Sequence, residues 1–202
     1  MKLSVFTGGF AQTNGWLLET PGGNLLVDAP EGIAGWLEQR GVRIDALLLT
    51  HQHYDHVLDA AALQKNGVPI HAFAAYSQDL TLEKPAREWG MPLNVEPFTV
   101  DHLIPPGEPL TLCGLEFSVA HVPGHATDSL TFHLPAHDLV LAGDALFQGS
   151  IGRTDLPGGD TETLLAGIRR HLLTLVPTTR VLPGHGPETT IAAEATGNPF
   201  LS

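Results

Sequence analysis

One stretch of seven residues, THQHYDH at 50–56, constrains this chain more than any other part of it. Four of the seven side chains, three imidazoles and one carboxylate, are of the kinds that bind metal ions. The stretch follows directly on the apolar run ALLL at 46–49, which is typical of a buried strand. Imidazole nitrogen and carboxylate oxygen suit zinc, iron and manganese. The pattern therefore predicts a metal site at the end of a buried strand.

Size and charge narrow the class of protein. The chain has 202 residues, of which 43% are hydrophobic, so we expect one domain, 1–202, with a sizeable core. The net charge of −12 and only ten Lys and Arg residues argue against a nucleic-acid partner, because phosphate binding needs basic clusters. The lone cysteine, Cys113, excludes internal disulfides and Cys-rich zinc motifs. We expect it to be a buried, inert thiol.

No apolar run approaches the length of a membrane span, and the first residues lack the core of a signal peptide. The expected location is therefore the cytoplasm, with no membrane partner. The sequence does not determine the oligomeric state.

The first half of the chain alternates signals for strands and helices. In order, we expect strands at 3–6, 14–20 and 25–28, a helix at 33–40, a strand at 44–50, a helix at 57–65 and a strand at 68–72. The turn PGGN at 21–24 makes 14–28 a hairpin. The later strand–helix–strand order predicts a βαβ unit. Asp28 is expected to cap the segment that follows it.

The middle of the chain, 73–107, is less regular because several prolines interrupt it. A helix at 75–82 and a strand at 98–100 are the elements we expect there. Irregular surface segments often carry specificity, so this region is a candidate for substrate selection.

The second half turns to strands. We expect a hairpin of 110–112 and 116–120 around Gly114, strands at 130–134 and 139–142, a helix at 161–175 capped by Asp160, a strand at 180–182 and a closing helix at 188–196. A fold of the α/β class, with two sheets packed together and helices outside, satisfies this order.

Three further places present a metal-binding side chain where a strand runs into a Pro/Gly turn or a glycine. These are His125 after HVPG, Asp144 after AG and His185 after LPG. Each alone has an ordinary structural role as a turn or cap residue. Together with the stretch at 50–56 they indicate one site built from several strand ends. The remaining candidates His71, His102, His133, His137 and His171 lack such surroundings and are expected to be structural or solvated.

In order and context, the pattern HxHxDH at 51–56 followed by His125, Asp144 and His185 resembles the metallo-β-lactamase superfamily over nearly the whole chain. The runs GDALF at 143–147, GRTD at 152–155, GHGP at 184–187 and NPFL at 198–201 resemble its short, single-domain glyoxalase II-like members, relatives of hydroxyacylglutathione hydrolases. The resemblance implies an αββα sandwich of two mixed β-sheets with helices on the outer faces.

The resemblance also implies a ligand set for two divalent metal ions, above all Zn²⁺, with Fe or Mn as the other choices. One ion takes His51, His53 and His125, the other takes Asp55, His56 and His185, and Asp144 bridges both. Asp55 and Asp144 are then the catalytic carboxylates. Two such ions hold a shared water as hydroxide near neutral pH.

The implied activity is hydrolysis of a small-molecule thioester of glutathione, such as lactoylglutathione, by this metal-bound hydroxide. With so few basic residues, Arg153 is the best candidate for binding a substrate anion, and its alternative role is a salt bridge to Asp155. Gln52 and Tyr54 either line the mouth of the pocket or face solvent.

Two other functions compete with this one. A mono-iron persulfide dioxygenase would use His51, His125 and Asp144, and that family is also similar in its GRTD run. The GP after His185 and the NPFL ending favour the hydrolase. A metal-binding module without catalysis would leave open coordination positions unused.

Overall fold

The computed structural model describes residues 1–91 and 93–201. The chain forms two compact units, of which unit 1 comprises Met1–Ile104 and Thr111–Leu115, and unit 2 comprises Pro105–Leu110 and Glu116–Ser202. Among the described residues, no helix has the length and apolar character needed to cross a bilayer.

The sheet of unit 1 begins as an antiparallel meander and continues with parallel strands. Its order is β1 (Lys2–Gly8), β2 (Thr13–Thr20), β3 (Gly23–Val27), β4 (Ala46–Leu48), β5 (Ile70–Ala72) and β6 (His102–Leu103). The predicted hairpin is confirmed, since β2 pairs antiparallel with β3 from Trp16 opposite Val27 to Thr20 opposite Gly23. From β3 onward each strand pairs parallel with the next, which requires crossover connections.

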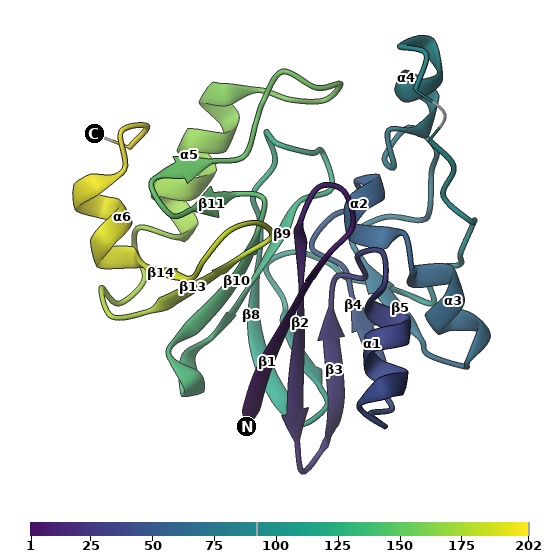
Figure 1. Cartoon of the computed structure of the whole chain (residues 1–202). Helices are drawn as coiled ribbons and strands as arrows, with labels where there is room; N and C mark the ends of the chain where they lie inside the picture. The colour runs from purple at the N-terminus through teal and green to yellow at the C-terminus, as the bar shows by residue number, and fades with distance from the viewer. Residues whose placement is uncertain (92, 202) are drawn as a thin grey trace. The chain divides into compact units, whose positions relative to one another are not determined.

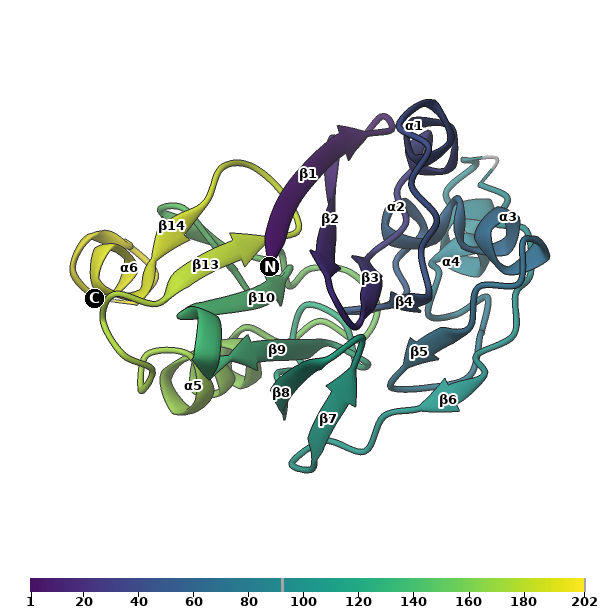
Figure 2. The same cartoon turned by 90° about the horizontal axis from the view of Figure 1, so that it is seen from below.

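Helices supply these crossovers. They are α1 (Ile33–Gln39) between β3 and β4, α2 (Tyr54–Val57) and α3 (Ala60–Lys65) between β4 and β5, and α4 (Glu83–Glu88) before β6. Helices α1, α2 and α3 lie together on one face of this sheet (Figures 1 and 2). Leu26, Leu47 and Ile70 of the sheet form a buried core with Ile33 and Val57 of the helices. The predicted βαβ unit is confirmed, although the single helix expected at 57–65 is two short ones.

The segment between β5 and β6 differs from its prediction. The predictions of a helix at 75–82 and a strand at 98–100 are wrong, because the helix begins at Glu83 and the strand at His102. The reason is the carboxylate of Glu83, which is fully buried. It accepts hydrogen bonds from the Tyr76 hydroxyl (2.9 Å), the Thr81 hydroxyl (2.7 Å) and the Val95 amide (2.9 Å). These side-chain bonds within the segment outweigh local helix propensity, and they hold its two ends together.

The main sheet of unit 2 has one parallel pair among antiparallel strands. Its order is β14 (Thr189–Thr190), β13 (Arg180–Pro183), β10 (Leu139–Gly143), β9 (Leu130–Leu134), β8 (Leu115–His121) and β7 (Pro109–Leu112). Figure 2 shows β10, β9, β8 and β7 side by side. β10 and β13 run parallel, so their carboxyl ends lie at the same edge. A separate hairpin pairs β11 (Leu146–Phe147) with β12 (Ser150–Ile151).

Two helices complete unit 2, α5 (Thr161–His171) and α6 (Ile191–Gly197). Asp160 caps α5 as predicted, since its side chain accepts a hydrogen bond from the Thr163 amide. The helix ends at His171, earlier than expected. α6 begins later than the expected 188 because Thr189–Thr190 pair with β13 as β14. Leu164 and Ile168 of α5 pack with Val140 and Val181 of the sheet in the core of this unit.

Cys113 is less buried than predicted. It lies in the turn between β7 and β8 with a φ of 50°, and it is half-buried. Burial raises the pKa of its thiol, and the negative charge of Asp45 raises it further. A neutral thiol agrees with the expected inertness.

Candidate metal centre

Four of the candidate ligands gather where β4 ends in unit 1. His51, His53 and His56 are buried, and Asp55 is half-buried. The ring of His51 lies 4.7 Å from that of His53 and 4.1 Å from that of His56, centroid to centroid. α2 begins at Tyr54, which places Asp55 and His56 in its first turn. The Asp55 Oδ2 and His56 Nε2 atoms are 3.6 Å apart.

Asp28 orients this group, a role that was not predicted. Its Oδ1 accepts a hydrogen bond from the Thr50 amide (2.8 Å), and its Oδ2 accepts from the Thr50 hydroxyl (2.8 Å). The same Oδ2 lies 2.9 Å from Nδ1 of His56. A carboxylate only accepts, so Nδ1 of His56 carries the proton and Nε2 is the coordinating nitrogen.

The expectation that Asp28 caps the next segment is therefore wrong, and the N-cap of α1 is Gly32. Asp28 adopts a φ of 61° at the end of β3, next to the end of β4. A signal was present in the sequence, since an acidic residue ends an apolar strand there. Only the pairing of β3 with β4 shows which residues it reaches.

Two further residues of unit 1 brace the ligands. The Thr13 hydroxyl donates to Oδ2 of Asp55 (2.6 Å), the oxygen that faces His56. Gln52, between His51 and His53, is fully buried, so of its two predicted alternatives the solvent-facing one is wrong. Its Nε2 donates to the carbonyl of Ala74 (2.8 Å), which ties the ligand stretch to the segment after β5.

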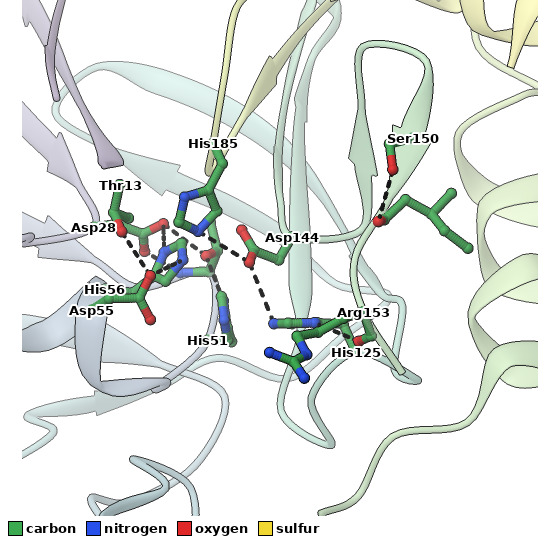
Figure 3. A network of polar contacts seen from close by, with 12 residues as sticks. Thr13, Asp28, His51, Asp55, His56, His125, Asp144, Ser150, Arg153 and His185 are labelled. Carbon is green, nitrogen blue, oxygen red and sulfur yellow. Dashed lines mark hydrogen bonds and ion pairs between the residues drawn. The ribbon is translucent and has the colours of Figure 1, made fainter. Parts of the chain in front are cut away.

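The other three candidates come together in unit 2. Asp144 follows β10 and His185 follows β13, the two parallel neighbours. His125 lies in the loop after β8, which the hydrogen bond from the Val122 amide to the Ser129 carbonyl closes. Oδ2 of Asp144 is 3.4 Å from Nε2 of His125 and 3.3 Å from Nε2 of His185 (Figure 3).

The tautomer of His125 follows from its partner. Its Nδ1 lies 2.8 Å from the backbone carbonyl of Arg153, and a carbonyl oxygen only accepts. Nδ1 therefore carries the proton, and Nε2, which faces Asp144, presents its lone pair. Outer partners of this kind fix the orientation of ligating histidines in metalloproteins.

The donor atoms fit a transition-metal ion. Two ligands about 2.0–2.1 Å from one tetrahedral ion are about 3.3–3.4 Å apart. In unit 2, the separations from Asp144 Oδ2 to His125 and His185 are 3.4 and 3.3 Å. In unit 1, the 3.6 Å between Asp55 and His56 is close to that value. Each unit by itself therefore holds donor atoms of the right kind at the spacing that an ion requires.

The side chain of Arg153 is engaged elsewhere. Its Nε and a terminal nitrogen bind both oxygens of Asp155, at 2.7 and 2.8 Å, so the alternative salt bridge is observed. Hydrogen bonding to Arg153 lowers the pKa of the Asp155 carboxyl to about 2. The pair is well exposed, so its contribution to stability is small. A role of Arg153 in binding substrate stays a prediction.

Of the five histidines expected to be structural or solvated, His137 is exposed, and His71, His102, His133 and His171 have structural surroundings. His71 is buried and stacks on His102 with ring centroids 4.5 Å apart. Burial, and then the nearby His102, lower the pKa of His71 to about 4. Burial also lowers the pKa values of His133 and His171.

Comparison with known proteins identifies the family. The statistical description of the metallo-beta-lactamase superfamily matches residues 8–185. The chain belongs to the metallo-β-lactamase superfamily. A superfamily relative from Bacillus subtilis, the probable metallo-hydrolase YqgX, is 37% identical over 210 residues that cover 100% of this chain and 98% of the relative. The hydroxyacylglutathione hydrolase GloC of Haemophilus influenzae is 39% identical over 170 residues, which cover 82% of this chain and 80% of the relative.

Solved structures of the superfamily show the fold. The BLEG-1 B3 metallo-beta-lactamase superposes with a TM-score of 0.89 at 34% identity and covers 100% of both chains. TTHA1623 in a di-iron-bound form superposes with a TM-score of 0.83 at 40% identity, covering 98% of this chain and 100% of that one. The expected metallo-β-lactamase fold, with two mixed β-sheets and helices, is confirmed. The relatives also support the prediction that the protein is a metal-dependent hydrolase.

Proposed function

We propose that this superfamily member hydrolyses thioesters of glutathione, such as lactoylglutathione, with two divalent metal ions. The spacing of donor atoms around Asp144 carries the metal-dependent part of the proposal. The choice of substrate rests on the relative from Haemophilus influenzae, which is named a hydroxyacylglutathione hydrolase. A small-molecule thioester is then the partner, without nucleic acid or membrane, and the cytoplasm is its proposed location.

The seven ligands divide between the two ions as the sequence pattern implies. His51, His53 and His125 hold one ion, Asp55, His56 and His185 hold the other, and Asp144 belongs to both. The position of Asp144 supports this division. One carboxylate oxygen lies at ligand spacing from both His125 and His185, which are assigned to different ions.

Zn²⁺ is the proposed metal because it suits a site of imidazoles and carboxylates. Related sites also accept iron, and TTHA1623 has been solved in a di-iron-bound form. Ligand chemistry alone discriminates weakly among zinc, iron and manganese, so metal analysis is part of the test.

When bound, two such ions supply an activated water and polarise the carbonyl that it attacks. The protein's own residues prepare the ligands for this chemistry. Asp28 holds the proton of His56 on Nδ1, and the carbonyl of Arg153 does the same for His125. Thr13 holds Asp55, whose charge, together with that of Asp144, offsets the charge of the cations. A thiolate leaves readily, so no strong general acid is required.

Arg153 is the proposed contact for a carboxylate of the substrate. The contact would compete with Asp155, because both oxygens of Asp155 already bind its guanidinium. If Arg153 binds substrate, then Arg153→Ala raises KM and leaves kcat nearly unchanged.

The deciding experiment measures bound metal in the purified protein and then assays three reactions with the same preparation. These are hydrolysis of lactoylglutathione, oxygen uptake with a persulfide substrate, and hydrolysis of a β-lactam. We expect about two metal ions per chain and thioester hydrolysis as the fastest reaction. One iron per chain with oxygen uptake and no hydrolysis would refute the proposal in favour of a dioxygenase. Fast β-lactam cleavage without thioester cleavage would refute the proposal that the substrate is a thioester.

Asp144→Ala tests the bridging carboxylate. We expect it to lose metal and hydrolysis together, because both ions lose a ligand. Asp155→Ala is the control for metal content alone, since this exposed carboxylate binds Arg153, the proposed substrate contact. Normal metal content and activity in Asp144→Ala would contradict the bridging role.

A further inference from the structure

The short hairpin formed by β11 and β12, together with the two residues that follow it, lies against the ligands of unit 2. The ring of Phe147 packs edge-on against His185, with centroids 5.9 Å apart and planes at 89°. Just beyond the hairpin, the Arg153 carbonyl holds Nδ1 of His125 (Figure 3). The position of the hairpin therefore affects both histidines.

Gly152, which follows β12, packs against Asp144, the third ligand of unit 2. A Cβ atom at this position would lie 1.9 Å from the backbone carbonyl oxygen of Asp144 and 3.0 Å from Cγ of His125. Only glycine permits this approach. Movement of the chain at 146–153 would accordingly move contacts of all three ligands.

Helix α6 anchors the hairpin through a buried carboxylate. Glu194 is 3% exposed, and its Oε2 accepts hydrogen bonds from the Gly149 amide (2.9 Å) and from Nδ2 of Asn198 (2.8 Å). Its Oε1 accepts from the Thr189 hydroxyl (2.6 Å). Nδ2 of Asn198 also donates to the carbonyl of Ser150 (3.0 Å). The turn residue Gly149 and the first residue of β12, Ser150, are thus both tied to α6 and its C-cap.

A carboxylate in this position is costly unless its donors hold it. Burial of a charge is unfavourable when the charge is not hydrogen-bonded, and loss of one partner leaves the others unsatisfied. Three donors from the hairpin, β14 and the end of α6 surround Glu194. These groups form one connected hydrogen-bond network. Among the described residues, Glu194 is the only side chain in it that bonds both the Gly149 amide of the hairpin and Thr189 of β14.

We infer that Glu194 is a positioning residue for the metal ligands His125, Asp144 and His185, acting through the β11–β12 hairpin. The inference rests on the proposed function, because it takes these residues to bind metal. Among the described contacts, Glu194 bonds none of these three ligands directly. It holds Gly149, and thereby keeps Phe147, Gly152 and Arg153 against the three ligands.

The test compares metal affinity in Glu194→Ala, Glu194→Gln and the wild-type protein by competition with a chromophoric chelator. We expect Glu194→Ala to bind Zn²⁺ about 10- to 100-fold more weakly, the range found for loss of outer partners of metal ligands. Glu194→Gln should recover most of the affinity, because its amide oxygen can still accept from Gly149 and Asn198 while the Thr189 hydroxyl rotates to accept from the amide nitrogen.

Thr196→Ala is the matched control in the same helix. The Thr196 hydroxyl bonds only the carbonyls of Ala192 and Ala193 within α6 in the described contacts. Its removal should leave metal affinity unchanged. An equal loss in Thr196→Ala and Glu194→Ala would show a general effect of helix stability and overturn the inference.

Amide hydrogen exchange in the metal-free proteins gives a second readout. In Glu194→Ala, exchange at 147–151 should become at least several-fold faster while β9 and β10 keep their protection. If Glu194→Ala does not fold, Asn198→Ala takes its place, since it removes the Ser150 contact and leaves Glu194 two donors. An intermediate loss of affinity is then expected.

Two results separate the inference from the proposed function. A folded Glu194→Ala with wild-type affinity and wild-type exchange would overturn the inference alone. A wild-type protein that binds no metal would overturn the proposed function, and the inference with it.

Discussion

At the scale of single residues, Asp28 shows how a residue outside the ligand pattern prepares a ligand. Its carboxylate accepts hydrogen bonds from the Thr50 amide, the Thr50 hydroxyl and Nδ1 of His56. The left-handed φ of 61° points this short side chain back at the neighbouring strand end. The tautomer of His56 therefore depends on the charge of Asp28.

Asp28→Asn should weaken metal binding about 10- to 100-fold. Asparagine tolerates the same backbone conformation, so the fold is kept. Its amide nitrogen donates, and facing Nδ1 of His56 it would shift the ring proton to Nε2, the coordinating atom. Asp45→Asn is the control, because that exposed carboxylate in the same unit binds the Asn24 amide. Equal affinities of Asp28→Asn and wild type in a chelator competition would contradict this role.

His71 shows a different consequence of burial. Its pKa is lowered from 6.5 to about 4, first by burial and then by His102. The unfolded state therefore binds more protons than the folded state between these values, and stability rises with pH across this window.

Acidification from pH 6.5 to 4 should accordingly destabilise the protein through His71. The lowering from 6.5 to about 4 corresponds to roughly 3 kcal/mol, since one pKa unit is worth about 1.4 kcal/mol. Urea unfolding of metal-free wild type and His71→Leu at several pH values measures this contribution as a difference. If the difference in free energy of unfolding between wild type and His71→Leu is the same at pH 6.5 and pH 4, His71 does not contribute to the pH dependence.

At the scale of elements, the hairpin of β11 and β12 shows where sequence patterns lose their information. Each strand has two residues, too few to show alternation, so neither was predicted. Longer elements such as β2, β8, α1 and α5 carry enough residues to show their type, and they were predicted well. The hairpin and the two residues after it nonetheless contact all three ligands of unit 2.

Gly152→Ala should abolish or greatly reduce metal binding. The added Cβ would meet the Asp144 carbonyl at 1.9 Å, so the ligand backbone or the hairpin must move. Gly107→Ala in the same unit is the control, because its Cβ meets nothing within 4 Å. With a φ of 85° it carries only backbone strain, about 1–2 kcal/mol. Similar metal content in the two variants would argue against a steric effect at Gly152.

At the scale of the whole molecule, the sequence predicted the class of fold and the places that offer ligands. Each ligand follows a strand end, so hydrophobic runs marked the positions before any contact was known. The partners of those ligands were not predictable in the same way. Asp28, Thr13 and Glu194 are ordinary in their local sequence, and only strand pairing and long-range packing give them their roles. That 1–202 is a single domain stays a prediction.

Metal removal tests the proposed centre at this scale. Metal ions at about 100 times their Kd should stabilise the fold by about 2.7 kcal/mol per site. For a chain of 202 residues this is a rise of roughly 5–10 °C in Tm per site. We expect chelator treatment to lower Tm by at least this amount and zinc to restore it. In a chelator-treated protein, a Tm unchanged by added zinc would count against the proposal.

Glu83 has a consequence for how the protein can be altered. Residues 76–95 are held by bonds from Tyr76, Thr81 and Val95 to this one carboxylate, all within the segment itself. The strand ends that carry the ligands of unit 1 are outside this arrangement. The segment is therefore suited to exchange between relatives as a cassette, with junctions at Tyr76 and Val95. New selectivity can be sought there by directed evolution while the ligand positions are left untouched.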